Sequence, residues 1–398
     1  MNKNDLKYKH LGEIDLKIGI PKEIKPGENR VAVTPDTVNK LIKRGFTVFV
    51  EKSAGLNAGF PDNKYIELGA EIIDDTALLY SNSEIILKVQ RPLFNNLLNK
   101  DEIDLVNPGT LVISLAFALH YPEVVKKSAD KGVNFLAMDM IPRTTLAQKM
   151  DALSSQANIA GYKSVILTAN YLGKIFPLLM TAAGTIQPAK VVIMGAGVAG
   201  LQALGTAKRL GAIVEVSDVR PSVKEEVESL GGKFIEVKAD ENLQDSGGYA
   251  KEVSEEFLQK QKALIFKHIT EADIVITTAL VPGKKAPILV TEEMIKNMRP
   301  GSVVLDMAVE FGGNCEISEN GKIVTKYDVT IIGESNLPSL VPTHASEVYS
   351  KNLLNLLDHI IKDGKLFPNM EDEIVKGSLL AFNGNIINEK INLILNKN

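Results

Sequence analysis

The sequence has almost no cysteine, and it has no segment suited to export or to crossing a membrane. Cys315 is the single cysteine in 398 residues, so an internal disulfide is excluded and a reducing compartment is expected. Residues 1–16 are polar and charged, whereas a secretory signal needs an apolar run. Stretch 191–207 is uncharged but contains glycines at a strand-to-helix change, and stretch 164–187 is interrupted by a lysine and a proline. Neither is expected to span a membrane, so we expect a soluble protein with a loosely attached arm at residues 1–16.

The sequence also lacks an excess of basic charge, a metal-ligand cluster and a catalytic histidine motif. With 45 basic and 49 acidic residues the net charge is −4, so nucleic acid is not an expected partner. No spacing of His, Cys, Asp and Glu matches a metal site, and no order of Ser, His and Asp matches a hydrolase. His120, which follows an expected strand, is the only one of five histidines placed like a base. Cys315 is expected to pack rather than react, because no histidine is near it in sequence.

The sequence does contain a regular alternation of strand and helix patterns, which is typical of parallel α/β sheets. Its length and 45% hydrophobic content favour two globular domains. Early strands are predicted at 17–20, 47–51, 84–89, 110–115 and 133–138, with helices at 35–44, 62–68 and 122–131. Later strands are predicted at 191–194, 213–216, 233–237, 273–277, 302–307 and 330–333. The predicted fold class is α/β, with two Rossmann-like doubly wound parallel-sheet domains joined by long helices.

Two long helical patterns are expected to connect these domains. The first, 146–172, is one helix or two, and the second, 342–362, is interpreted as the return crossing. The pattern after residue 367 is too short to be a domain alone. We therefore predict a first α/β domain from 17–145 plus 345–398, and a nucleotide-binding domain with its linking helix at 146–344.

A glycine-rich turn in the second domain has the sequence that dinucleotide binding requires. An apolar strand is followed by Gly195, Gly197 and Gly200, then by a helix pattern and a second strand that leads to Asp218. The first glycine allows a sharp turn, the second leaves room for a pyrophosphate, and the third lets the helix pack close to the sheet. The free N–H groups at the helix start attract negative charge. The alternative is a glycine turn that binds no ligand.

The acidic residue after the second strand favours NAD over NADP. The carboxylate of Asp218 is placed to accept hydrogen bonds from the ribose hydroxyls. A 2′-phosphate about 4 Å away would meet a repulsion of roughly 4 kcal/mol per unit charge at an effective dielectric near 20. Arg220 could in principle offset this repulsion. NAD is the predicted cofactor.

Two polar segments could add to this site. Loop 238–248 is acidic, ends in two glycines and is followed by Tyr249, so it is either a lid or a solvated excursion. Arg143, Gln148, Asp151 and Ser154 are spread over a loop and the first turns of a helix. The alternative for this second segment is helix capping.

These segments together resemble the NAD(H)-binding subunit, domain I, of proton-translocating nicotinamide nucleotide transhydrogenase. The shared motifs are IPKE…ENRVAVTP at 20–35, the R-x-x-x-x-Q-x-x-D-A-L-S-S-Q run from Arg143, MTAAGT at 180–185, GAGVAGLQA from Gly195, SDVRP at 217–221, GGYAKE at 247–252, TTALVPGKKAP at 277–287 and GGNCE at 312–316. The first and fourth also occur in alanine dehydrogenases, whereas the arginine–glutamine–aspartate run and GGYAKE are more specific.

The resemblance implies roles for individual residues. Arg143, Gln148, Asp151 and Ser154 would hold the nicotinamide end and act in catalysis, and Tyr249 would lie on a mobile loop that closes over the cofactor. The cofactor-binding residues would be Gly195, Ala196, Gly197, Val198, Ala199, Gly200, Asp218, Val219, Arg220, Tyr249, Thr278, Ala279 and Leu280. The family's reaction passes a hydride from NADH directly to NADP⁺ on another domain, coupled to proton movement across a membrane.

Comparison with the related alanine dehydrogenase gives two positions that match it and two that differ. Arg30 and Lys88 match the dehydrogenase's substrate-carboxylate residues. Its catalytic histidine aligns with Ala116, however, and its catalytic aspartate with Glu310. A lost base costs a dehydrogenase ~10²–10⁴ in rate, whereas transfer between two nicotinamides needs no proton at the ring. The missing base therefore favours transhydrogenation.

The resemblance also implies partners. The chain ends at Asn398 without membrane helices, as in transhydrogenases whose NAD(H)-binding subunit is a separate polypeptide. Membrane and NADP(H)-binding subunits, a homodimer, and a cytoplasmic location peripheral to the inner membrane are then expected. The alternatives are a stand-alone amino-acid or imino-acid dehydrogenase and a non-catalytic NAD(H)-binding regulatory protein.

Overall fold

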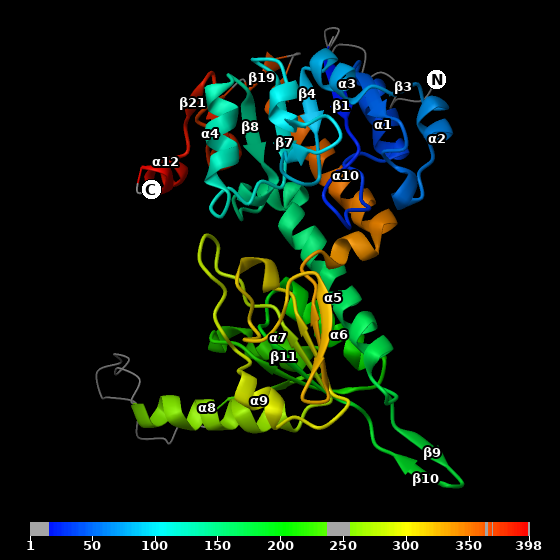
Figure 1. Ribbon diagram of the computed structural model, residues 1–398, viewed down its shortest axis with the longest axis vertical. Helices are drawn as coiled ribbons and strands as arrows, with labels where there is room; N and C mark the ends of the chain where they lie inside the picture. Colours follow the sequence, from blue (N-terminus) through cyan, green and yellow to red (C-terminus); the bar gives the residue numbers. More distant parts are fainter. Residues whose placement is uncertain (1–15, 237–254, 363–364, 368, 397–398) are drawn as a thin grey trace. The chain divides into compact units, whose positions relative to one another are not determined.

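The computed structural model describes residues 16–236, 255–362, 365–367 and 369–396 (Figure 1). Its contacts divide the chain into two compact units. The first contains the chain up to Gln156 and again from Pro338 onward, and the second contains Ala157–Leu337. The predicted domain limits are 145 and 345, whereas the contacts divide the chain after Gln156 and before Pro338.

A doubly wound sheet forms the centre of the first unit. Its strand order is β3-β2-β1-β4-β7-β8-β20-β21, in which the first six strands are parallel and the last two pair antiparallel. These strands are β1 (Lys17–Ile20), β2 (Thr47–Glu51), β3 (Glu71–Ile73), β4 (Ile85–Leu87), β7 (Leu111–Ser114), β8 (Asn134–Ala137), β20 (Leu379–Phe382) and β21 (Asn385–Ile386).

The central strands β4 and β7 of the first unit are buried along their whole length because both faces of the sheet are covered. Ile85 and Leu87 belong to one buried cluster, with residues of α1 and α10, whereas Ile86 belongs to another, with residues of α3, α4 and α12. The helices of this unit are α1 (Pro35–Ile42), α2 (Asp62–Ile66), α3 (Thr76–Asn82), α4 (Pro122–Asp130), α10 (Pro342–Ile360), α11 (Glu373–Ser378) and α12 (Glu389–Leu395). Two short antiparallel pairs add β5 (Phe94–Asn95) with β6 (Lys100–Asp101), and β18 (Ile361–Lys362) with β19 (Lys365–Leu366).

The second unit repeats the doubly wound topology. Its sheet has the order β13-β12-β11-β14-β15-β17-β16, parallel except for β16. The strands are β11 (Lys190–Met194), β12 (Ile213–Ser217), β13 (Lys233–Phe234), β14 (Ile274–Thr277), β15 (Val303–Asp306), β16 (Lys322–Lys326) and β17 (Val329–Gly333). The α-helices that lie wholly in this unit are α6 (Val198–Arg209), α7 (Lys224–Ser229), α8 (Glu255–Thr270) and α9 (Glu292–Lys296). The predicted fold class is confirmed.

Both faces of the second sheet are also buried. Val191 and Ile193 pack in one cluster with α6, and Val192 and Met194 pack in the other. Cys315 lies in that second cluster, 2% exposed, and burial raises the pKa of its thiol to about 12. The expectation that it packs rather than reacts agrees with this environment.

The first long helical pattern follows one of its two predicted alternatives, and the second differs from its interpretation. Segment 146–172 is two helices, because η4 (Leu146–Met150) is a 3₁₀ helix and α5 (Ala152–Tyr171) begins after Asp151. The interpretation of α10 as the return crossing is wrong. The chain re-enters the first unit within η8 (Leu337–Leu340), and α10 lies wholly inside that unit because its apolar face packs into the first core.

Several short elements were not predicted. They include β3, α3 and β16, the C-terminal strands β20 and β21, and a hairpin of β9 (Leu179–Thr181) and β10 (Gly184–Ile186) within stretch 164–187 (Figure 1). Within the described part of the chain, no helix is both long and apolar enough to cross a bilayer.

The C-terminal strands are expected to be essential to the first unit. Leu380 in β20 is fully buried in the core cluster that β20 forms with α4, so Leu380→Ala should lower the free energy of unfolding by about 2–5 kcal/mol. Urea denaturation measures this. Leu393→Ala is the matched control, because Leu393 is 60% exposed and its loss should cost less than about 0.5 kcal/mol. Equal effects of the two substitutions would contradict the packing of β20.

Candidate nucleotide site

The glycine turn follows β11 at the carboxyl edge of the second sheet. Gly195 has φ 114°, a conformation that side chains rarely adopt. A Cβ on Gly200 would lie 1.9 Å from the Gly195 carbonyl oxygen, so only glycine lets α6 begin this close to the strand. A Cβ on Gly197 would meet nothing within 4 Å, which leaves open space at the N-terminus of α6. This is the geometry in which helix N–H groups receive a phosphate.

The strand order places a second candidate segment beside this turn. The order reverses between β11 and β14, and ligands bind at such switch points, outside the carboxyl ends of the strands. Thr278, which follows β14, donates its backbone N–H to the Met194 carbonyl at 2.9 Å and its hydroxyl to the Gly195 carbonyl at 3.2 Å. The structure therefore brings Gly195–Gly200 and Thr278–Leu280 together.

Asp218 lies at the end of β12 and is already engaged. Its Oδ2 accepts the Ala196 N–H at 2.7 Å. The backbone N–H and the guanidinium of Arg220 donate to the two oxygens of the Asp218 carboxylate at 2.8–3.0 Å. Burial by itself raises the pKa of Asp218, but the hydrogen bonds from Arg220 and Ala196 outweigh it and hold that pKa below its usual value. The Arg220 side chain is 56% exposed and neutralises part of the negative charge. This ion pair weakens the repulsion that Asp218 alone would exert on a 2′-phosphate.

The four polar residues from the arginine–glutamine–aspartate run meet in one cavity of the first unit. Arg143, Gln148, Asp151 and Ser154 line a space of about 260 Å³, together with Pro142, Thr144, Thr145 and Ala147. The capping interpretation is supported, because Asp151 accepts the backbone N–H of Ser154 at 2.8 Å and its hydroxyl at 2.5 Å. Asp151 thus starts α5 and contributes to the cavity at once.

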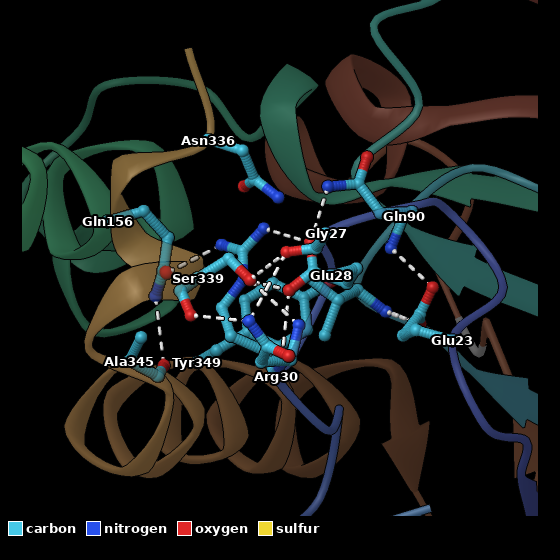
Figure 2. A network of polar contacts seen from close by, with 12 residues as sticks. Glu23, Gly27, Glu28, Arg30, Gln90, Gln156, Asn336, Ser339, Ala345 and Tyr349 are labelled. Carbon is cyan, nitrogen blue, oxygen red and sulfur yellow. Dashed lines mark hydrogen bonds and ion pairs between the residues drawn. The ribbon is translucent and has the colours of Figure 1, made fainter. Parts of the chain in front are cut away.

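Lys88 directly follows β4, and Arg30 lies in the loop after β1; these two strands flank the point where the strand order of the first sheet reverses. Arg30 is 3% exposed and donates to the Glu28 carboxylate at 2.7–2.8 Å and to the Gln156 side-chain oxygen at 2.8 Å (Figure 2). Lys88 is fully buried, with its Nζ 2.8 Å from Glu102 and 3.5 Å from Glu23. Both cations are therefore paired with carboxylates of the chain itself.

The titration of this buried cluster follows from its charges. Burial alone would raise the pKa of Glu28, but the charge and hydrogen bonds of Arg30, with Gln90, outweigh it and lower the pKa to about 2. Burial raises the pKa of Glu23 to about 7, because Lys88 and the Val89 N–H only partly offset the desolvation. Sequence reasoning missed these carboxylates, although the charged PKE…ENR segment beside apolar strands was an available signal.

Of the two positions aligned with the dehydrogenase's acid–base residues, 116 has no titratable side chain and 310 keeps a carboxylate. Ala116 is fully buried and presents a methyl group, while its backbone N–H donates to Asp139 at 2.5 Å. Glu310, in the 3₁₀ helix η7 (Val309–Phe311), accepts a hydrogen bond from the Ser335 hydroxyl at 3.2 Å. His120 lies in the turn before α4, with its backbone N–H donating to Phe117. The predicted loop 238–248 and Tyr249 lie outside the described residues.

Comparisons with known proteins agree with this architecture. Residues 19–160 match the family model "Alanine dehydrogenase/PNT, N-terminal domain", and residues 164–389 match "Alanine dehydrogenase/PNT, C-terminal domain". The chain is 48% identical to an NAD(P) transhydrogenase alpha-subunit chain of Rhodospirillum rubrum over 94% of this chain and 98% of that protein.

Two solved structures are similar along their whole length. A transhydrogenase from Sinorhizobium meliloti superposes with a TM-score of 0.83 at 44% identity, covering 93% of this chain and 99% of that one. An L-alanine dehydrogenase superposes with a TM-score of 0.77 at 27% identity, covering 96% and 99%. The chain belongs to the alanine dehydrogenase/PNT family and, within it, to the alpha subunits of NAD(P) transhydrogenase.

Proposed function

We propose that this chain binds NAD(H) and exchanges a hydride with NADP(H) held on a partner subunit, in a reaction coupled to proton translocation. The observation that carries the NAD(H) site is the glycine turn at the switch point of the second sheet. The open space at Gly197 and the start of α6 at Val198 fit a pyrophosphate. When bound, the nicotinamide supplies or receives the hydride.

Different groups of residues would bind different parts of the dinucleotide. Gly195–Gly200 would receive the pyrophosphate, and Asp218, with Val219 and Arg220, the adenosine ribose. Thr278–Leu280 would form the opposite wall of the crevice. Arg143, Gln148, Asp151 and Ser154 would hold the nicotinamide end, supported by the cavity they share. Two members of that set are already fixed to each other by hydrogen bonds, which favours a pre-organised site.

The buried ion pairs oppose the amino-acid dehydrogenase alternative. A substrate carboxylate would have to displace Glu28 from Arg30 or Glu102 from Lys88. Breaking a buried pair leaves an uncompensated charge, which costs several kcal/mol. Ala116 also offers no proton acceptor where that chemistry needs one.

We further propose that the chain works as a homodimer, joined to membrane and NADP(H)-binding subunits and lying at the cytoplasmic periphery of the inner membrane. The relatives' name "subunit alpha" supports partner chains. Hairpin β9–β10 supports a contact between subunits, because Leu179, Met180 and Ile186 on it are 43%, 73% and 46% exposed.

Asp218 is expected to set the preference between nucleotides. Fluorescence titration should show a much lower dissociation constant for NADH than for NADPH. Asp218→Ala should weaken the binding of NADH by about 1–3 kcal/mol and narrow the gap in affinity between the two nucleotides. Arg220→Ala should widen the gap, because it removes the cation that neutralises Asp218. Asp36→Ala, which removes an exposed carboxylate from α1, is the control. Equal affinity of the wild-type protein for both nucleotides would remove the role of Asp218.

The purified chain alone should bind NADH and reduce almost nothing. Its described residues contain one glycine phosphate turn, whereas transhydrogenation needs two nucleotides at once. We expect hydride transfer from NADH to a thio- or acetylpyridine analogue only after an isolated NADP(H)-binding transhydrogenase domain is added. Turnover of alanine or pyruvate by this chain alone, at an ordinary enzymatic rate on the order of 1–10³ s⁻¹, would contradict this proposal and favour the amino-acid dehydrogenase alternative.

Gln148 is expected to affect hydride transfer more than NADH affinity. Gln148→Asn shortens a side chain that lines the cavity, so transfer in the mixed assay should fall about 10–100-fold with a smaller change in dissociation constant. Asp151→Asn is the comparison, since it also weakens the cap of α5 and should lower the thermal midpoint. Poor binding with normal transfer in Gln148→Asn would assign this run to helix capping alone.

A further inference from the structure

We propose that Asn314 is a positioning residue of the nucleotide site, whose side-chain amide holds the segment Thr278–Leu280 against the glycine turn. The proposal rests on the assignment of this crevice to NAD(H). It concerns a residue outside the predicted site, in the loop after β15.

Asn314 is fully buried and pairs with both backbone polar groups of one residue. Its Oδ1 accepts the Ala279 N–H at 3.0 Å, and its Nδ2 donates to the Ala279 carbonyl at 2.9 Å. Strand β14 ends at Thr277, so Ala279 lies just beyond the sheet ladder. The side chain supplies the two hydrogen bonds that a neighbouring strand would otherwise supply.

The same amide also fastens the far end of the segment. Nδ2 donates a second hydrogen bond, at 2.8 Å, to the carbonyl of Pro287. One side chain therefore closes the loop 279–287 at both ends. Leu280 and Val281, which lie in between, are 49% and 43% exposed and offer an apolar surface beside the crevice.

The position of this segment matters because it touches the glycine turn directly. Thr278 donates to the Met194 and Gly195 carbonyls, and a Cβ on Gly195 would lie only 2.5 Å from the Thr278 hydroxyl. A shift of Ala279 would pull Thr278 away from that turn. Sub-ångström placement of groups around a ligand depends on such supporting contacts.

The loop that carries Asn314 is itself held by a buried carboxylate. Asp306, fully buried at the end of β15, accepts the Cys315 N–H at 2.9 Å and the Ser318 hydroxyl at 2.6 Å. The same carboxyl accepts the Thr277 hydroxyl at 3.2 Å, so it joins the ends of β14 and β15. These hydrogen bonds attach the loop that carries Asn314 to the ends of two strands of the sheet.

Asn314→Ala and Asn314→Asp in the full chain test this role. The alanine removes all three hydrogen bonds, and the aspartate keeps an acceptor for the Ala279 N–H but places an oxygen against two carbonyls. We expect the NADH dissociation constant, measured by fluorescence well below the thermal midpoint, to rise about tenfold or more in both.

Asn134→Ala is the matched control. Asn134 is a buried asparagine of the first unit that joins two loops, with Nδ2 donating to Gly109 and Oδ1 accepting from Asn383, both at 2.9 Å. Its loss should lower the thermal midpoint about as much as Asn314→Ala, yet leave the NADH dissociation constant within about twofold. A merely structural role for Asn314 would give the same pattern as this control.

A measurement on the wild-type protein keeps the proposal testable if the variants do not fold. The Ala279 amide should exchange slowly with solvent deuterium even without nucleotide, and exchange at the rate of an unstructured peptide would overturn the proposal. Unchanged NADH affinity in both Asn314 variants would also overturn it and leave the NAD(H) site intact. Failure of the wild-type chain to bind NADH at all would instead overturn the proposed function.

Discussion

A close approach of backbone segments at the end of β11 sets the geometry of the nucleotide site. The Gly195 carbonyl lies where a side chain on Gly200 would stand, and the Thr278 hydroxyl donates to that same carbonyl. No change of rotamer can relieve a clash between backbone atoms, so a single methyl group at Gly200 would move α6 away from the strand. The free N–H groups of α6 and the loop after β14 can share one crevice only while this approach is kept.

The two units have the same winding and use their switch points differently. In the second unit the turn after the first strand is made of small residues and leaves space. In the first unit the corresponding position is filled by Arg30, Glu28 and Lys88, whose charges are satisfied within the chain. Desolvated cations with internal partners gain little from an added carboxylate. This is a physical reason why a fold shared with alanine dehydrogenase suits hydride exchange between nucleotides in this chain.

The backbone segments that line the site in the second unit are held in place by hydrogen bonds from buried side chains. Asp306 ties two strand ends together, and the loop it holds carries Asn314, which pairs with the backbone of Ala279. These side chains are buried, so their hydrogen bonds are protected from competition with water. The crevice is therefore shaped by residues that a ligand would not touch.

Much of the fold could be predicted from the sequence, but the short elements could not. Strands such as β11 and β7 read as continuous apolar runs because both sheet faces are covered, and that property is visible locally. Strand β16 contains only exposed and half-buried residues, and β20 depends on pairing with β8, far away in sequence. Such strands exist because a neighbour is present, so their own residues carry little signal.

The sequence by itself determined the glycine turn, the acidic residue after the next strand and the polar run at the start of a helix, because glycine sterics, periodicity and capping act between near neighbours. Only the tertiary structure decided that Arg220 neutralises Asp218, that Glu28 and Glu102 occupy Arg30 and Lys88, and that Asn314 holds Ala279. Whether a charge is paired or an amide is satisfied depends on which groups the packed chain brings within hydrogen-bond distance, and local sequence patterns do not contain that information.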